Sequence, residues 1–232
     1  MKKSKFYSNV HLYLALGLLA IFIGFFPTYF GKLSETKMPY HVHGISATLW
    51  MVILIIQPYL YKINNLKVHK YLGWSTVILV PTLVFGGFEM MKSMIQNQAN
   101  YPPDVVYQLA FIDAVTLLGF IVLYALALYH RKNLKLHARF MVCTIFGPLN
   151  PAVTRIFFYV GLASNFNQAL TYAYLLLEII LAIIIWRERS SREMKFTYLP
   201  VLLFTLIQHV LMYSANNWEW WVKIMNGIAG YE

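Results

Sequence analysis

Charged residues are scarce in this sequence, and cysteine is almost absent. Only 12% of the 232 residues are charged, about half of the roughly 25% found in soluble domains. The single cysteine, Cys143, excludes an internal disulfide and a zinc site built from several cysteines. Glycine-rich nucleotide motifs of the Walker and Rossmann types are also missing. In their place 59% of the residues are hydrophobic, which predicts a membrane protein.

The apolar residues occur in long runs that predict the fold class. A helix needs about 20 mostly apolar residues to cross roughly 30 Å of hydrocarbon. The sequence therefore predicts an all-α polytopic membrane protein, a seven-transmembrane-helix bundle forming one membrane domain over residues 1–232. The spans are expected at about 9–30, 42–62, 70–91, 105–130, 138–161, 168–187 and 195–215. The tryptophan-rich tail, 216–232, is expected to lie in the membrane interface.

The basic residues alternate between the connectors. Of the 19 lysines and arginines, 14 fall at the N-terminus and in the second, fourth and sixth connectors, four fall on the opposite side, and Arg155 lies inside a span. By the positive-inside rule we expect a cytoplasmic N-terminus and an outside C-terminus, in the inner (cytoplasmic) membrane. The membrane lipids, and not nucleic acid, are the expected partners of the net charge of +10.

One short motif occurs twice. Asn65-Leu66-Lys67-Val68-His69 is repeated as Asn133-Leu134-Lys135-Leu136-His137. Each copy joins two apolar runs and ends on a histidine at the start of the next run. One interpretation is that two equivalent helices each offer a histidine at the same depth. The other is that a basic turn suited to anionic headgroups is used twice.

Ionisable side chains also occur inside the predicted spans. Each costs about 2.5–3.5 kcal/mol on insertion scales, so such residues usually mark a site or pathway. The predicted topology places six of them in or just below the outer half of the bundle: His43, Glu89, Asp113, Arg155, Glu178 and His209. Trp50 and Gln57 share a helix face with His43, and Tyr174 shares one with Glu178. We expect these groups to line a common chamber.

Simpler interpretations of the same residues stay open. Glu89 is spaced to pair with Lys92 at the interface, and His43 is placed to cap a helix end. Asp113 and Arg155 suit a buried ion pair with a purely structural role.

The fifth predicted span contains Gly147-Pro148-Leu149-Asn150-Pro151 near mid-membrane. Each proline removes a helical hydrogen bond. Irregular backbone at that depth is tolerated where it is buried in protein or lines a cavity. The segment predicts a broken helix that places Asn150 and Arg155 next to a cavity; a kink that serves packing alone is the alternative.

Three kinds of chemistry fit these residues. The favoured one is a haem- or metal-binding redox protein with a redox partner or a small-molecule substrate. Bis-histidine haem b needs two imidazoles from facing helices around an apolar slot. The predicted histidine layers are His69 with His137 near the cytoplasmic face and His43 with His209 toward the outer face.

The second chemistry is a metal-dependent membrane enzyme acting on a lipid or small amphiphile. His43 and His209 with Glu89 and Asp113 form a ligand set suited to a Zn or Fe ion. Catalytic roles then fall to Glu178, Asp113 and Arg155, with a carboxylate outside the metal shell acting as general base.

The third is a small-solute or proton-coupled transporter, in which a broken helix, a buried arginine and buried acids bind an anion or relay protons.

Some of these residues also carry a resemblance. His43-Gly44, Gln57 and His69-Lys70-Tyr71-Leu72-Gly73 resemble a family of uncharacterised bacterial multi-pass membrane proteins, whose pattern is His, then Gln, then His-Arg-x-x-Gly. The family's second signature, His-x-x-Trp-Met followed by Arg, looks like His137-Ala138-Arg139-Phe140-Met141 with Arg155.

The resemblance covers roughly residues 40–160, with Lys70 in place of Arg and Phe140 in place of Trp. It implies no activity. The chain is more distantly similar to transmembrane haem-b cytochromes with histidines on four consecutive helices. The fourth span here has no interior histidine, so the fourth ligand would come from the seventh.

Overall fold

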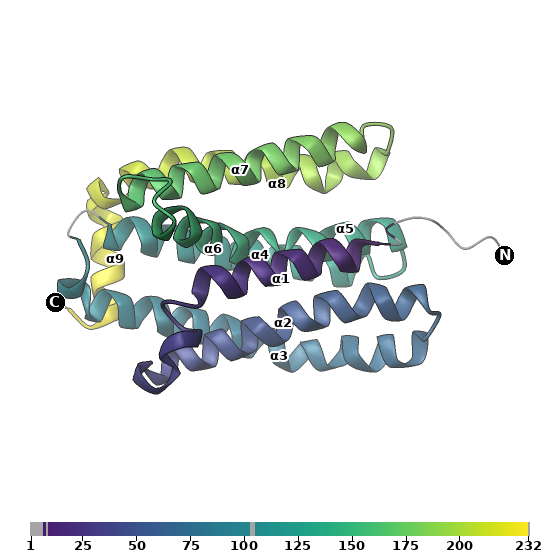
Figure 1. Ribbon diagram of the computed structural model, residues 1–232, viewed down its shortest axis with the longest axis horizontal. Coiled ribbons are helices and arrows are strands. Elements are labelled where there is room, and N and C mark those ends of the chain that lie inside the picture. The colour runs from purple at the N-terminus through teal and green to yellow at the C-terminus, as the bar shows by residue number, and fades with distance from the viewer. Residues whose placement is uncertain (1–6, 8, 103–104, 232) are drawn as a thin grey trace.

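The computed structural model describes residue 7 and residues 9–102 and 105–231, and this part of the chain is 84% helical with no strands (Figure 1). The α-helices are α1 (Val10–Phe25), α2 (Met38–Lys62), α3 (Leu66–Gln96), α4 (Val106–Tyr129), α5 (Leu134–Cys143), α6 (Phe146–Tyr159), α7 (Phe166–Arg187), α8 (Tyr198–Leu211) and α9 (Glu219–Ala229). Short 3₁₀ turns are η1 (Phe30–Glu35), η2 (Gln98–Asn100), η3 (Arg192–Phe196) and η4 (Met212–Asn217).

Six segments within the described residues are long and apolar enough to cross a membrane: Met38–Lys62, Leu66–Gln96, Val106–Tyr129, Leu134–Tyr159, Phe166–Arg187 and Arg192–Asn217. They overlap the second to seventh predicted spans, and the fold is that of a multi-pass membrane protein. The first predicted span is shorter as a helix, because α1 ends at Phe25, two residues before Pro27, which has no amide hydrogen with which to continue the helix. Its 16 residues reach about 24 Å, so the count of seven spans stays a prediction.

The long helices run side by side in three groups (Figure 1). The α2–α3 hairpin lies on one side, α1, α4, α5 and α6 lie in the middle, and the α7–α8 hairpin lies on the other side. The connectors 63–65, 130–133 and 188–191 lie at the same end of the bundle (Figure 1), which we call the basic end. The other end is called the α9 end.

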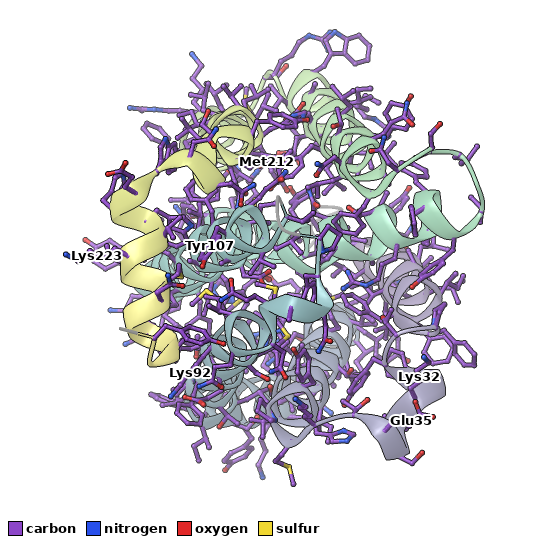
Figure 2. All side chains as sticks on the ribbon, turned by 90° about the vertical axis from the view of Figure 1, so that its left-hand side faces the viewer. Lys32, Glu35, Lys92, Tyr107, Met212 and Lys223 are labelled. Carbon is purple, nitrogen blue, oxygen red and sulfur yellow. The ribbon has the colours of Figure 1, made fainter. Side chains whose placement is uncertain are left out.

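Helix α9 lies across the α9 end, roughly perpendicular to the long helices (Figure 1). One face packs Trp221, Met225 and Ala229 into a core shared with α3, α4 and α7. Trp221 Nε1 also donates to the Tyr107 carbonyl at 2.9 Å. Lys223 points away from the bundle in Figure 2. Helix α9 is thus amphipathic, as helices at membrane interfaces commonly are, and the interfacial position of the tail stays a prediction.

The helix interruption predicted around the two prolines is present, but it lies further upstream. Helix α5 ends at Cys143 and α6 begins at Phe146. The proline ring at position 148 clashes with the carbonyl four residues before it, at Thr144. The Thr144 and Ile145 amides bond instead to carbonyls three residues back, Met141 and Val142, both at 3.2 Å.

Glycines allow close helix crossings, as small residues commonly do in membrane bundles. A β-carbon on Gly24 of α1 would lie 2.4 Å from the backbone oxygen of Ala152 on α6. A β-carbon on Gly86 of α3 would lie 2.8 Å from the backbone nitrogen of His43 on α2. The α1–α6 and α2–α3 contacts therefore need glycine at these two positions.

Replacing Gly24 by valine is expected to destabilise the bundle by about 1–3 kcal/mol, because the added side chain overpacks the α1–α6 contact. Thermal unfolding in detergent measures the effect as a lower melting temperature. Gly227→Ala is the control, since no atom lies within 4 Å of a β-carbon there. Equal melting temperatures for the two variants would contradict the close crossing.

Candidate functional site

A large cavity of about 1600 Å³ opens at the basic end, between α1, α2, α3, α5 and the end of α4. Both histidines of the repeated motif line it, as do Trp50 and Gln57. Its volume exceeds the roughly 300–1,000 Å³ of an ordinary small-molecule pocket. Two of the four predicted histidine ligands thus share one cavity.

The repeated motif explains how the histidines reach this position. Asn65 and Asn133 cap α3 and α5: the Asn65 side chain accepts from the Val68 amide at 3.3 Å, and the Asn133 side chain from the Lys135 amide at 3.1 Å. Each histidine then falls in the first turn of its helix, four residues after the cap. The motif is therefore both a helix-starting turn and a means of placing a histidine in the cavity.

The two imidazoles are held in the same way. His69 Nδ1 lies 3.2 Å from the Gln57 carbonyl on α2, and His137 Nδ1 lies 2.8 Å from the Ala127 carbonyl on α4. A carbonyl oxygen only accepts, so Nδ1 carries the hydrogen in both rings, and in the neutral ring Nε2 is the nitrogen with the free lone pair. A second-shell hydrogen bond of this kind fixes the tautomer of most metal-ligating histidines.

Gln57 contributes another polar atom to the same cavity. Its side-chain nitrogen donates to the His69 carbonyl at 3.1 Å. Its side-chain oxygen is buried, and in the described part of the chain it has no hydrogen-bond partner. Buried polar atoms are normally satisfied, so this oxygen is available to a ligand or an ordered water.

Trp50 marks the inner end of the cavity. The indole is buried, packs edge-on against Phe120 and Tyr124, and donates from Nε1 to the Thr144 hydroxyl at 3.2 Å. Thr144 lies at the α5–α6 interruption and also lines a second cavity of about 50 Å³. Asn150 lines this second cavity, and its buried Oδ1 has no partner among the described residues. Asn150 therefore lies beside a cavity next to the broken helix, as predicted, whereas Arg155, predicted to lie there too, lines neither of these two cavities.

His209 and Glu178 form a close pair between α8 and α7. The His209 Nδ1–Glu178 Oε1 distance is 2.8 Å, and the Tyr174 ring stacks on the imidazole at 4.7 Å. The Tyr213 hydroxyl lies 3.4 Å from His209 Nε2. Both ring nitrogens therefore have partners, and the pair is suited to holding or passing a proton.

Asp113 and Arg155 are near neighbours without direct contact. The ion pairs of the described residues are Lys135–Glu193, Arg139–Glu188 and His209–Glu178. Arg155 donates to the Pro151 carbonyl at 2.9 Å, and its guanidinium lies 4.5 Å from the centre of the Phe25 ring. It still interacts electrostatically with Asp113.

His43 lies apart from His209. Its Nδ1 is 3.3 Å from the Leu83 carbonyl of α3, and Gly87 leaves room for its ring. Glu89 is half-buried on α3 and does not pair with Lys92. In the ranges that the structure covers, no three His, Cys, Asp or Glu side chains gather closely enough to hold a metal ion. Asp113 nevertheless interacts electrostatically with both Arg155 and Tyr174, so part of the expected outer cluster is connected, and the common chamber stays a prediction.

A polar cluster at the basic end was missed by the sequence reasoning. Buried Arg139 donates from Nε to Glu188 Oε2 at 2.7 Å and from Nη2 to the Ser191 hydroxyl at 3.0 Å. The Tyr7 hydroxyl donates to Glu188 Oε1 at 2.7 Å and bonds to Tyr198. Burial raises the pKa of Tyr7, so the hydroxyl keeps the proton that it donates. The cluster ties α5, α7 and α8 to the segment before α1.

Arg139→Leu is expected to lower the melting temperature by roughly 6–12 °C, because it leaves the Glu188 carboxylate without its cationic partner at a cost of about 3 kcal/mol. The double variant Arg139→Leu/Glu188→Leu should recover part of this loss. Exposed Arg192, changed to leucine, is the control. A double variant less stable than Arg139→Leu alone would show that the charges are not coupled.

No protein-family model, curated protein or solved structure matches this chain. The functional assignment therefore depends on the geometry of this chain's own residues.

Proposed function

We propose that this chain is a seven-span protein of the cytoplasmic membrane that binds haem b in the large cavity, with His69 and His137 as the two axial ligands, and that it transfers electrons. The observation that carries the proposal is the matched pair of imidazoles. Both line one cavity, both come from the same motif, and both donate Nδ1–H to a carbonyl of the preceding helix.

The residues around the cavity fit such a group. Leu14, Leu54, Trp74 and Met141 are among the side chains that make its walls largely apolar, and low-polarity walls are one of the levers by which proteins tune haem. The carbonyls of Gln57 and Ala127 hold the imidazole rings in orientation. When bound, the haem supplies one-electron oxidation and reduction.

The proposal does not use the outer histidine layer. Both ring nitrogens of His209 are engaged, by Glu178 and Tyr213. The proposal rests on His69 and His137 alone. It therefore keeps one of the two predicted histidine layers.

The absorbance spectrum of protein purified in detergent, after expression with a haem precursor, tests this function. We expect a Soret band and a reduced spectrum typical of six-coordinate haem. His69→Ala and His137→Ala should each abolish six-coordination, because each removes one axial nitrogen. His11→Ala is the control, since His11 is a half-buried histidine of α1 that packs against Tyr59.

A colourless wild-type protein after haem supplementation would refute the haem assignment. Elemental analysis of the same sample then decides about the metal-enzyme alternative: about one Zn or Fe per chain, lost in His69→Ala, would assign the histidine pair to a metal ion.

The proposed orientation rests on the basic residues and is tested by cysteine labelling in intact cells. Buried Cys143 gives little background. Asn217→Cys at the α9 end should react with a membrane-impermeant maleimide from outside. Lys132→Cys at the basic end should react only after the cells are permeabilised. The reverse pattern would invert the topology, and labelling of both from outside would contradict the span count.

A further inference from the structure

The large cavity carries an unbalanced positive charge. Lys62, Lys70 and Arg131 line it, from the end of α2, the start of α3 and the connector after α4. None of the residues that line the cavity is acidic. None of the three takes part in the ion pairs found among the described residues. Three exposed cations from three segments therefore border one space without a carboxylate, and the Lys62 amine donates to the Asn9 side chain at 3.3 Å.

Apart from His69, His137, Gln57 and a few other polar residues, the cavity has an apolar lining that extends away from these charges. Leu14 of α1, Leu54 of α2, Val77 of α3 and Met141 of α5 line it. A space with cations on some of its walls and hydrocarbon on others matches a molecule with an anionic head and an apolar tail. Basic pockets between membrane helices on the cytoplasmic side bind anionic headgroups by the same physics.

We propose that the large cavity binds an anionic phospholipid, with its phosphate near Lys62, Lys70 and Arg131 and an acyl chain along the apolar walls. The proposal concerns the same cavity as the proposed function but does not depend on a haem. The volume of about 1600 Å³ exceeds that of ordinary ligand pockets, so it leaves space for a lipid beside a second group. The lipid would close the cavity to water on the side where the cations lie.

Native mass spectrometry of delipidated wild-type protein, prepared without added haem, tests the lipid site. We expect phosphatidylglycerol to bind about tenfold or more tightly than phosphatidylcholine, because only the former keeps a net negative headgroup. Lys70→Gln and Arg131→Gln should each weaken binding about fivefold, since a cation near an anionic headgroup contributes about 1 kcal/mol. Lys92→Gln and Lys223→Gln, at the α9 end, are the matched controls and should bind as the wild type does.

A second variant tests the cavity without changing charge. A β-carbon on Gly73 would meet only the Gln57 side-chain nitrogen, at an ordinary contact distance of 3.5 Å. Gly73→Leu should therefore fold, fill part of the cavity and weaken phosphatidylglycerol binding with all three cations intact. Unchanged binding in this variant would place the lipid on the protein surface and overturn the proposal.

Two other results would also overturn it. Equal binding of the two lipids would show that headgroup charge plays no part. Full competition by millimolar inorganic phosphate would make the site one for free phosphate. If the lipid binds and no Soret band forms after haem supplementation, the proposed function fails and the lipid site stands.

Discussion

The hydrogen bond from a histidine Nδ1 to a fixed acceptor on a neighbouring helix is the interaction on which this structure depends. His43, His69 and His137 use a backbone carbonyl, and His209 uses the Glu178 carboxylate. A buried ring N–H needs an acceptor, and within the hydrocarbon layer that acceptor must come from the protein. In the three carbonyl cases the bond also decides the tautomer and leaves Nε2 with its lone pair. Each of these bonds therefore links two packed helices and also sets which ring nitrogen is available for chemistry.

The two ends of the bundle use this interaction differently. At the basic end two histidines border a cavity large enough for a cofactor, and the Trp50–Thr144 hydrogen bond lies at its inner limit. Beyond it is the smaller cavity with the unsatisfied Asn150 oxygen, and Tyr174 extends from there to the His209–Glu178 pair. The large cavity and the buried His209–Glu178 pair are thus separated by the interrupted α5–α6 helix.

Much of the fold could be predicted from local sequence signals. Apolar runs indicated the helices, and the repeated Asn-Leu-Lys-x-His motif combines a helix cap with a histidine at a fixed offset. Pro148 predicted the interruption, although the break lies at Thr144–Ile145 because a proline ring disturbs the carbonyl four residues upstream. The first predicted span extended beyond Phe25 because the residues around Pro27 are apolar, and hydropathy alone does not show that the helix ends there.

The arrangement of the polar groups was less accessible to sequence reasoning. Depth in the membrane follows from helix order, and this put five ionisable residues in one layer with Glu178 just below it. Which of them meet depends on how helices pack around the bundle axis, and the α7–α8 hairpin places His209 against Glu178 while His43 faces α3. Arg139 follows the basic residues of a connector and was counted with them. Its partner, Glu188, is 49 residues away in the sequence. Such long-range pairs leave no periodic signal in a single sequence.

Electron paramagnetic resonance of the oxidised, haem-supplemented protein tests the central claim most directly, since it reports on the axial ligands themselves. The account predicts a low-spin ferric signal typical of two imidazole ligands, replaced by a high-spin signal in His137→Ala. A high-spin signal in the wild type, or a low-spin signal that survives loss of His69 and His137 together, would contradict it.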